Sequence, residues 1–458
     1  MSAGPRHIAV IDIGKTNAKL ALVDRAAMSE LAVLTRPNRV LPGPPYPHFD
    51  TEGHWAFILA GLAQFQASHG VDGISITTHG ACAVLLSADG TLAVPVLDYE
   101  HDGPEETASD YHTLRPDFAA TGSPRLGMGL NLGAQLHWLL ARDASLADRA
   151  AHVVTWPQYW GHRLTGVLAC DLSSLGCHTD LWEPAGARFS SLVKSLGLQG
   201  KLAQPMRPDA VLGAVLPDIA SATGIAQGTP VVCGIHDSNA SLLPHLLAQT
   251  GAFSVVSTGT WVVCMAVGGA APAMIEARDM LVNVAADGSA VPSARFMGGR
   301  EYEMMRQPNA PATTLQDEAD VMASAVMLLP SVMPDGGPFP KRGMGWTVPI
   351  AGVSEAGREV ALSFYLALMT AECLAMIGAA GPVIVEGPFA ANPAFCRMLA
   401  AATGRPVLCA ASQTGTSIGA ALLFGAPDAA PPMQATDAPA NAAAYADYAR
   451  AWRRAISG

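Results

Sequence analysis

The segment from Asp12 to Lys19 is the first part of this chain whose residue types suit a defined chemistry. It reads Asp-Ile-Gly-Lys-Thr-Asn-Ala-Lys and follows a short apolar run. An aspartate that ends a buried strand just before a small polar turn is well placed to hold Mg²⁺ through water. The residues that offer donors or positive charge to phosphate oxygens are Gly14, Lys15, Thr16, Asn17 and Lys19. A simple polar hairpin turn is the alternative.

The Gly-Lys-Thr string inside this segment is not a P-loop. That motif needs a glycine at the position of Ala9. It also needs a helix after the lysine, whereas the residues after this turn predict a strand.

A second carboxylate, Asp237, follows another apolar run, in the segment Gly-Ile-His-Asp-Ser-Asn-Ala. A carboxylate at such a place can accept the proton of an attacking hydroxyl group that comes within hydrogen-bond reach. Its neighbours His236 and Ser238 are candidates to hold a substrate. The alternative is that Asp237 only caps the helix that follows it.

Two further polar segments follow strand-like runs. Thr78, His79 and Gly80 would present polar groups at the end of a strand, and Asp98 could accept a hydrogen bond from a sugar hydroxyl. The alternatives are a histidine that only makes structural hydrogen bonds and a solvated acid.

A second strand–turn–strand unit is predicted around Thr258-Gly259-Thr260. Small turns expose backbone N–H groups, so two such turns that face each other across a cleft would suit a nucleotide held between two domains. Farther on, the run from Glu386 to Phe389 joins a strand to a helix that opens near Asn392, and Gly387 with Asn392 would suit an adenine or ribose contact. Unrelated tight turns are the alternative.

The pattern of apolar residues and turn signals predicts alternating strands and helices. Strands are expected at 8–13, 18–23, 31–35, 74–77, 83–86, 229–234, 253–257, 261–267 and 382–386. Helices are expected at 55–68, 131–140, 156–164, 361–377, 392–403, 415–424 and 445–454. The Ala/Pro-rich stretch 426–440 is expected to be loose.

The composition limits the class of protein. The 458 residues carry a net charge of −11 without a basic stripe, which argues against nucleic acid or an anionic membrane as a partner. The eight cysteines include no CxxC pair, which is typical of buried thiols in a reducing cytoplasm. The charge-free stretch 250–275 is long enough to span a membrane, but its Gly, Ser and Thr content favours two buried strands.

Taken together, these segments resemble the FGGY family of carbohydrate kinases. The segments that carry the resemblance are Asp12–Lys19, Arg163–Gly166 with Asp171, Gly228–Val232 leading to Asp237, Gly404–Val407 and Gly419–Leu422. The resemblance implies an α/β fold of two actin-like domains (ribonuclease H-like, as in hexokinase and heat-shock chaperone ATPases) with an interdomain active-site cleft. The first domain would span 1–228 with the sugar site and the first phosphate motif, and the second 229–458 with the catalytic base and the nucleotide site.

Within that family, His236-Asp237-Ser238 and Ser257–Trp261 are similar to the rhamnulokinase and fuculokinase branch. The resemblance makes Asp237 the catalytic base. Asp12 and Asp237 are the expected metal-binding residues. The resemblance implies sugar contacts for Thr78, His79, Gly80, His236 and Ser238, and nucleotide contacts for Thr260 and Gly387. Gly259 and Asn392 are expected at the nucleotide from the residue patterns above.

The expected function is therefore transfer of the ATP γ-phosphoryl group, with Mg²⁺, to a ketose such as L-rhamnulose or L-fuculose. Xylulose, ribulose, erythrulose or glycerol are alternative acceptors. An actin-like ATPase switch and a non-catalytic sugar-binding regulator are alternatives from other classes. The expected partners are a small sugar and ATP, and the expected form is a cytoplasmic monomer or homodimer.

Overall fold

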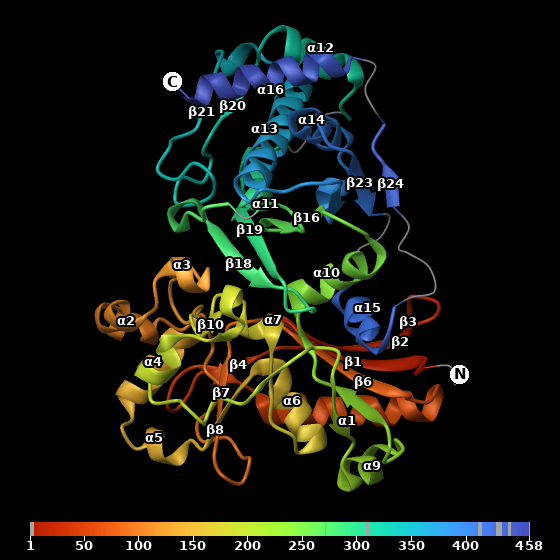
Figure 1. Cartoon of the computed structure of the whole chain (residues 1–458). Coiled ribbons are helices and arrows are strands. Elements are labelled where there is room, and N and C mark those ends of the chain that lie inside the picture. Colours follow the sequence, from red (N-terminus) through yellow and green to blue (C-terminus); the bar gives the residue numbers. More distant parts are fainter. Residues whose placement is uncertain are drawn as a thin grey trace. The chain divides into compact units, whose positions relative to one another are not determined.

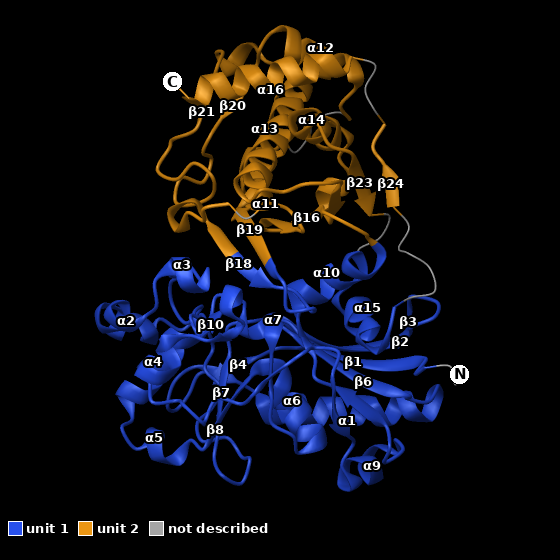
Figure 2. Ribbon diagram, in the orientation of Figure 1, with its two compact units in different colours: residues 1–248, 282–290, 414–430 blue, residues 249–281, 291–413, 431–458 orange. Residues whose placement is uncertain are grey.

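The computed structural model folds the chain into two compact units, which Figures 1 and 2 show as ribbons. The structure describes residues 4–270, 272–307, 312–410, 415–426, 433–437 and 441–457. Unit 1 comprises Met1–Ala248, Val282–Ala290 and Thr414–Ala430, and unit 2 comprises Gln249–Leu281, Val291–Gln413 and Pro431–Gly458.

The first division between the units falls after Ala248, whereas the sequence analysis placed it at 228/229. The physical reason is strand pairing. The short strands β14 (Pro230–Val232) and β15 (Ile235–His236) both pair in parallel with β6 (Gly73–Thr78) of unit 1. Asp237, which follows β15 directly, therefore belongs to unit 1.

Unit 1 is built on a seven-stranded sheet. Its path is β13 (Val211–Ala214), β14, β6, β1 (His7–Ile13), β2 (Asn17–Asp24) and β3 (Ser29–Pro37), with β15 also beside β6. β1 and β2 form an antiparallel hairpin in which Asp12 lies opposite Lys19. The hairpin and its turn confirm the predicted strand–turn–strand unit.

Helices cover both faces of this sheet, and the side chains of β1 alternate between them. Ile8 and Val10 lie in one buried cluster, with residues of α10 (Asp237–Ala248) and α15 (Thr416–Ala421). Ile11 lies in another, with residues of α1 (Thr51–Ser68) and α6 (Trp156–Thr165). The sheet is therefore buried on both sides, and polar groups reach solvent at its strand ends.

The segment between β6 and β14 adds a separate buried cluster that includes Tyr111 and Trp138. The remaining helices and strands of unit 1 are β4 (Val40–Leu41), β5 (His48–Phe49), β7 (Ala83–Leu86), α2 (Ala108–Leu114), α3 (Phe118–Thr121), α4 (Leu132–Arg142), α5 (Leu146–Arg149), β8 (His152–Thr155), β9 (Cys170–Asp171), α7 (Leu172–Leu175), β10 (Trp182–Glu183), β11 (Arg188–Phe189), α8 (Ser191–Ser195), β12 (Pro205–Met206) and α9 (Pro217–Thr223). Few of these short elements were predicted, because they lack a clear period.

The sheet of unit 2 repeats the same plan. Its path is β18 (Met280–Val284), β19 (Ala290–Phe296), β17 (Val262–Val267), β16 (Phe253–Thr258), β22 (Val383–Glu386), β23 (Val407–Ala410) and β24 (Met433–Ala435). β16 and β17 form an antiparallel hairpin, and β22 lies parallel to β16 as β6 lies parallel to β1. The stretch 250–275 is thus mainly a buried hairpin, as predicted, and β24 falls in the stretch that was expected to be loose.

The other elements of unit 2 are α11 (Gly298–Met305), α12 (Leu315–Ala323), β20 (Leu328–Leu329), β21 (Gly345–Trp346), α13 (Glu355–Met376), α14 (Pro393–Thr403) and α16 (Ala442–Ser457). α13 is the one described helix that is long and apolar enough to cross a membrane, and 78% of its apolar window is buried inside the protein. α13 is therefore buried to the extent that is usual for a core helix. All eight cysteines are free, and only Cys409 is not buried.

Glu318 on α12 connects α16 to the rest of unit 2. Substitution of Glu318 tests this packing. The Glu318 carboxylate is 1% exposed and accepts hydrogen bonds from Arg397 and from the hydroxyl of Tyr445. Glu318→Ala would leave the Arg397 guanidinium without its partner, so we expect the free energy of unfolding to fall by about 3 kcal/mol.

The exposed pair of Arg450 and Asp447 is the matched control. Asp447→Ala is expected to cost less than about 1 kcal/mol, because water screens the pair. Urea denaturation of both variants measures the difference, and equal losses would contradict the packing role of Glu318.

Candidate active site

The turn between β1 and β2 is held from both sides by backbone and side-chain hydrogen bonds. The N–H of Gly14 donates to the carbonyl of Asn17 at 2.9 Å. Asn38 donates its backbone N–H to Thr16 (2.9 Å) and its side-chain amide to the carbonyl of Gly14 (2.8 Å). The ring of His54 lies 2.7 Å from the Asn38 side-chain oxygen. The exposed Thr16 and Asn17 are therefore presented on a braced turn.

Asp12 lies below this turn, with only 9% of its surface exposed. Its carboxylate accepts a hydrogen bond from the hydroxyl of Thr416, and Ser417 and the Lys19 ammonium lie 3.4 Å and 3.7 Å away. Burial raises the pKa of the Asp12 carboxyl, and the charge of Asp237 adds to the rise, whereas Thr416 and Lys19 oppose it. A cation beside Asp12 would relieve this penalty.

Asp237 is the first residue of α10, and its side chain is one-third exposed (33%). Its carboxylate accepts the N–H of Ser238 at 2.6 Å and lies 3.2 Å from the Nε2 atom of His236. The exposed carboxylate and the buried Asp12 interact electrostatically within unit 1. The structure thus brings together the two acids that the sequence singled out.

His236 and Gly80 lie directly behind Asp237. The ring of His236 is buried, and its Nε2 atom lies 3.5 Å from the Sγ atom of Cys177. Burial would lower the pKa of His236, but the negative charges of Cys177 and Asp237 outweigh it and raise the pKa to about 10. A Cβ atom at Gly80 would lie 3.0 Å from this ring, so glycine lets the loop approach it. Cys177 was not predicted as part of the site.

The ring of His79 lies among aromatic side chains. Its centroid is 5.3 Å from both Phe49 and Tyr99 and 6.4 Å from Trp156. Its Nδ1 atom contacts the carbonyl of Gly80 at 2.7 Å, and its buried Nε2 atom has no hydrogen-bond partner among the described residues. Asp237 contributes to the electrostatic environment of this ring. His79 therefore belongs to the same site as the exposed acid.

Lys15 and Asp98 form one ion pair, although the sequence analysis gave them separate roles. The Lys15 ammonium pairs with Asp98, lies 3.1 Å from Glu100 and sits 4.7 Å above the ring of Tyr99. Thr78 is fully buried, and its hydroxyl donates to the backbone carbonyl of His79 at 2.8 Å. In this structure Thr78 shapes the loop.

The second predicted turn, in unit 2, is also braced. Gly259 donates its N–H to the carbonyl of Trp261 at 3.0 Å. The Thr258 hydroxyl bonds the carbonyl of Glu386 and accepts the N–H of Phe389 at 3.1 Å. Gly387 has a φ of +80°, and a Cβ atom there would lie 2.0 Å from the Thr258 carbonyl oxygen. Glycine is thus required where the strand end meets the turn.

The first residues of α11 pack against the same turn. A Cβ atom at Gly299 would lie 1.9 Å from the carbonyl oxygen of Gly259, and the N–H of Arg300 donates to Thr260 at 3.3 Å. This helix was not predicted from the sequence. The pair Gly298-Gly299, which follows an apolar strand, was the signal from which the start of this helix could have been predicted.

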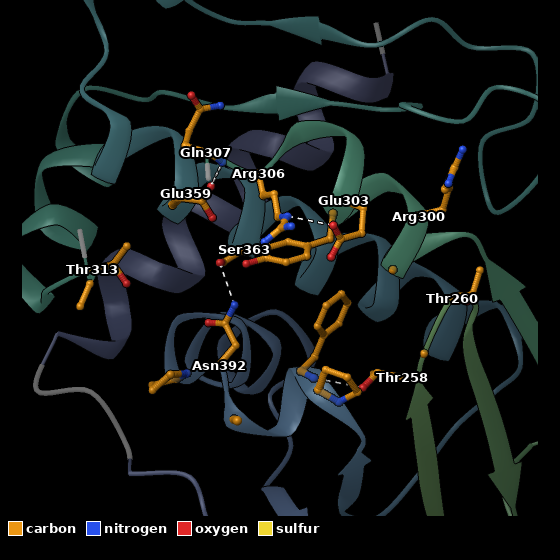
Figure 3. Close-up of a pocket in the computed structure, with 18 residues that line it drawn as sticks. Thr258, Thr260, Arg300, Glu303, Arg306, Gln307, Thr313, Glu359, Ser363 and Asn392 are labelled. Carbon is orange, nitrogen blue, oxygen red and sulfur yellow. Dashed lines mark hydrogen bonds and ion pairs between the residues drawn. The ribbon is translucent and has the colours of Figure 1, made fainter. Parts of the chain in front are cut away.

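A cavity of about 1020 Å³ opens beside this turn in unit 2, and Figure 3 shows its walls. Its lining includes Gly259, Thr260, Arg300, Phe389, Ser363 and Asn392. Asn392 caps α14 by accepting the N–H of Phe395 at 3.1 Å and donates to the Ser363 hydroxyl at 2.9 Å. Gly259, Thr260 and Asn392 therefore share one cavity, whereas Gly387 is not among its lining residues and approaches the backbone of Thr258, which does line it.

The donor set in unit 1 fits a hard, partly hydrated cation. The described residues contain no group of three or more His, Cys, Asp or Glu side chains that could enclose a metal ion. Asp12 and Asp237 instead supply carboxylate oxygens next to hydroxyl groups. Mg²⁺ in nucleotide sites takes one or two carboxylates and keeps several waters, so these residues fit it.

Two units with this paired-hairpin plan define the two-domain actin-like class, and known structures agree. A carbohydrate kinase from Novosphingobium aromaticivorans is 34% identical, with a TM-score of 0.91 over 99% of both chains. A structure named as a xyloylose kinase from Brucella ovis shares the fold at 18% identity and a TM-score of 0.78, over 99% of both chains.

The model of the FGGY family of carbohydrate kinases, N-terminal domain, matches residues 7–244, and that of carbohydrate kinase FGGY, C-terminal domain, matches 250–432. The chain therefore belongs to the FGGY family of carbohydrate kinases. Among curated relatives, an L-fuculokinase from Salmonella typhi is 25% identical over 56% of each chain. A probable L-xylulose kinase from Pasteurella multocida is 26% identical over 54% of each. The match thus spans little more than half the length of these relatives.

His54, which braces the first turn, gives a pH-dependent test. Burial lowers its pKa from 6.5 to about 4 in the folded protein. Between these values the unfolded chain binds a proton that the folded protein does not, so stability falls as the pH drops from about 6.5 towards 4. His54→Gln removes this contribution, which is on the order of 1–3 kcal/mol.

Denaturant unfolding of both proteins at pH 7 and pH 5 measures the effect. The wild type is expected to lose more stability than His54→Gln over this interval. An equal or smaller loss in the wild type would show that His54 takes up its proton in the folded state.

Proposed function

We propose that the protein is an ATP-dependent kinase that transfers the γ-phosphoryl group to a hydroxyl of a small ketose. The observation that carries this proposal is the exposed carboxylate of Asp237, close to both the buried Asp12 and the ring of His79. An acid with this exposure can meet a substrate hydroxyl, and membership of the FGGY family supports the reaction class.

Within this proposal, Asp237 orients the acceptor hydroxyl and takes its proton. Phosphoryl transfer has a loose transition state, so positioning and charge neutralisation supply most of the rate. The exposed residues Thr16 and Asn17 of the braced turn bind phosphate oxygens. Mg²⁺, when bound by Asp12 and Asp237, would supply positive charge to the phosphates. Lys19 adds positive charge beside Asp12.

The ketose is proposed to lie against His79, His236 and Tyr99, with contacts from Gly80, Ser238 and the Lys15–Asp98 pair. The aromatic rings offer an apolar surface to a deoxy carbon, and the unpartnered Nε2 atom of His79 offers a hydrogen bond to a hydroxyl. This favours a 6-deoxyketohexose such as L-rhamnulose or L-fuculose, phosphorylated at O1. The curated relatives named L-fuculokinase and rhamnulokinase support this choice, and the probable L-xylulose kinase supports xylulose as the alternative.

The nucleotide is proposed to bind in the cavity of unit 2. Gly259 and Thr260 would donate to phosphate oxygens, whereas the hydrogen-bonded Ser363 and Asn392 offer polar groups that suit the base or ribose. Gly387 would help to position the wall of this cavity. We further propose that the protein works in the cytoplasm as a monomer or homodimer.

A coupled ADP-release assay over rhamnulose, fuculose, xylulose, ribulose, erythrulose and glycerol tests the function. We expect ADP formation that depends on one of the 6-deoxyketohexoses. Asp237→Asn should lower kcat by about 10²–10⁴-fold, because the general base is lost. ADP formation independent of every acceptor would indicate an ATPase switch, and no ADP formation at all would indicate a sugar-binding regulator.

Gly299→Ala tests the nucleotide site. Its new Cβ would meet the Gly259 carbonyl and push α11 away from the turn, so we expect KM for ATP to rise at least tenfold, by about 1–3 kcal/mol of strain. KM for the ketose should stay near that of the wild type. Gly345→Ala is the control, because a Cβ atom there would meet nothing within 4 Å. A wild-type KM for ATP in Gly299→Ala would contradict the assignment.

A further inference from the structure

Cys396 and Cys409 bring two thiols together from different elements of unit 2. Cys396 lies on α14 and Cys409 on β23, and their Sγ atoms are 3.4 Å apart. A disulfide needs an S–S distance of about 2.0 Å, so small side-chain rotations have to close the remaining gap.

The two thiols differ in access and in acidity. Cys396 is 2% exposed, whereas Cys409 is half-buried and is the one cysteine with a partly exposed surface. The hydrogen bond from Cys396 lowers the pKa of Cys409 to about 6; the Thr436 hydroxyl supports the shift, and burial opposes it. The same pairing raises the pKa of Cys396. Cys409 is thus the accessible thiolate, and Cys396 the protonated neighbour.

A metal site is a poorer explanation of this pair. Soft metal ions in proteins usually take three or four ligands, and the described residues contain no third His, Cys, Asp or Glu that completes such a group. The remaining neighbours of Cys396 are the carbonyl oxygens of Phe389 and Ala390, at 3.6 Å and 3.9 Å.

We propose that Cys409 and Cys396 are a modification site, a dithiol that peroxide oxidises to an intramolecular disulfide. The Cys409 thiolate attacks one oxygen of hydrogen peroxide, the O–O bond breaks, and the departing hydroxide takes up a proton to become water. Cys409 is then a sulfenic acid. The Cys396 sulfur attacks it and loses its proton, the S–O bond breaks, and a second water leaves. Two thiols lose two electrons in total, and peroxide is reduced to two waters.

Oxidation of this thiol pair affects the cavity of unit 2 through the turn that contains Phe389. The Cys396 Sγ atom lies 3.6 Å and 3.9 Å from the carbonyl oxygens of Phe389 and Ala390, and Phe389 lines the cavity. Disulfide formation turns the Cys396 sulfur towards Cys409 and changes its contacts with this turn. If the cavity binds the nucleotide, as proposed above, oxidation raises KM for ATP several-fold and leaves KM for the ketose unchanged. This consequence rests on the proposed function, whereas the disulfide itself does not.

A second thiol pair in unit 2 provides an internal control. Cys264 and Cys373 interact closely enough for Cys264 to raise the pKa of Cys373, but both are 0% exposed. Peroxide has no access to these two thiols in the folded protein. We therefore expect Cys264 and Cys373 to stay reduced, although they are close together.

The test treats the folded, reduced protein with hydrogen peroxide, alkylates the remaining thiols after denaturation and maps them by mass spectrometry. We expect the free-thiol count to fall by two from eight, with Cys396 and Cys409 in one cross-linked peptide pair and Cys264 and Cys373 alkylated. In Cys396→Ser, dimedone should trap the sulfenic acid at Cys409. Dithiothreitol should restore the thiol count and KM for ATP, and Cys409→Ser should resist both changes.

Two results would overturn the proposal. One is full alkylation of Cys396 and Cys409 after peroxide treatment. The other is oxidation of Cys409 to sulfinic or sulfonic acid while Cys396 stays free. Because thiol mapping needs no catalytic activity, a confirmed disulfide in an inactive protein would separate failure of the proposed function from failure of this site.

Discussion

The hydrogen bond between Thr416 and the buried carboxylate of Asp12 is the interaction on which unit 1 depends. It joins the second-last residue of β1 to a helix 404 positions later, so the far end of the chain completes the site at its beginning. A buried carboxylate is costly unless its lone pairs are satisfied, and α15 supplies the hydroxyl groups that satisfy it. The same burial keeps Asp12 dependent on a nearby cation, which is the property that a phosphate site can use.

The two units use one strand plan but support their turns differently. In unit 1 the turn is braced by side chains, since Asn38 bonds both of its ends and His54 holds Asn38. In unit 2 the turn is held by close backbone approach, which Gly299 and Gly387 allow because neither carries a Cβ atom. Substitution is therefore expected to act on unit 1 through lost hydrogen bonds and on unit 2 through steric overlap.

Much of this fold follows from the sequence, because both hairpins combine alternating or continuous apolar runs with small polar turns. Asp12 and Asp237 could be found in the same way, since each follows such a run. The residues that contact the site could not be found from the sequence. Thr416 lies in a helix whose small residues indicate only tight packing, and Cys177 has no motif of its own. The pairing of Lys15 with Asp98 was also beyond sequence reasoning, because 83 residues separate them. Convergence of the two turns on one triphosphate stays a prediction.

The interleaved order of the units has a consequence for biosynthesis. A ribosome that has released residues up to Ala248 has made β1, β6 and Asp237 but not α15, which belongs to unit 1 and comes after most of unit 2. Domains usually fold in the order in which they emerge. Until α15 has been translated, one face of the nascent N-terminal sheet has α10 but lacks α15, and Asp12 lacks its hydroxyl partner. A chain that stops before α15 would therefore lack the hydroxyl partner of Asp12, although Asp12 itself lies in β1.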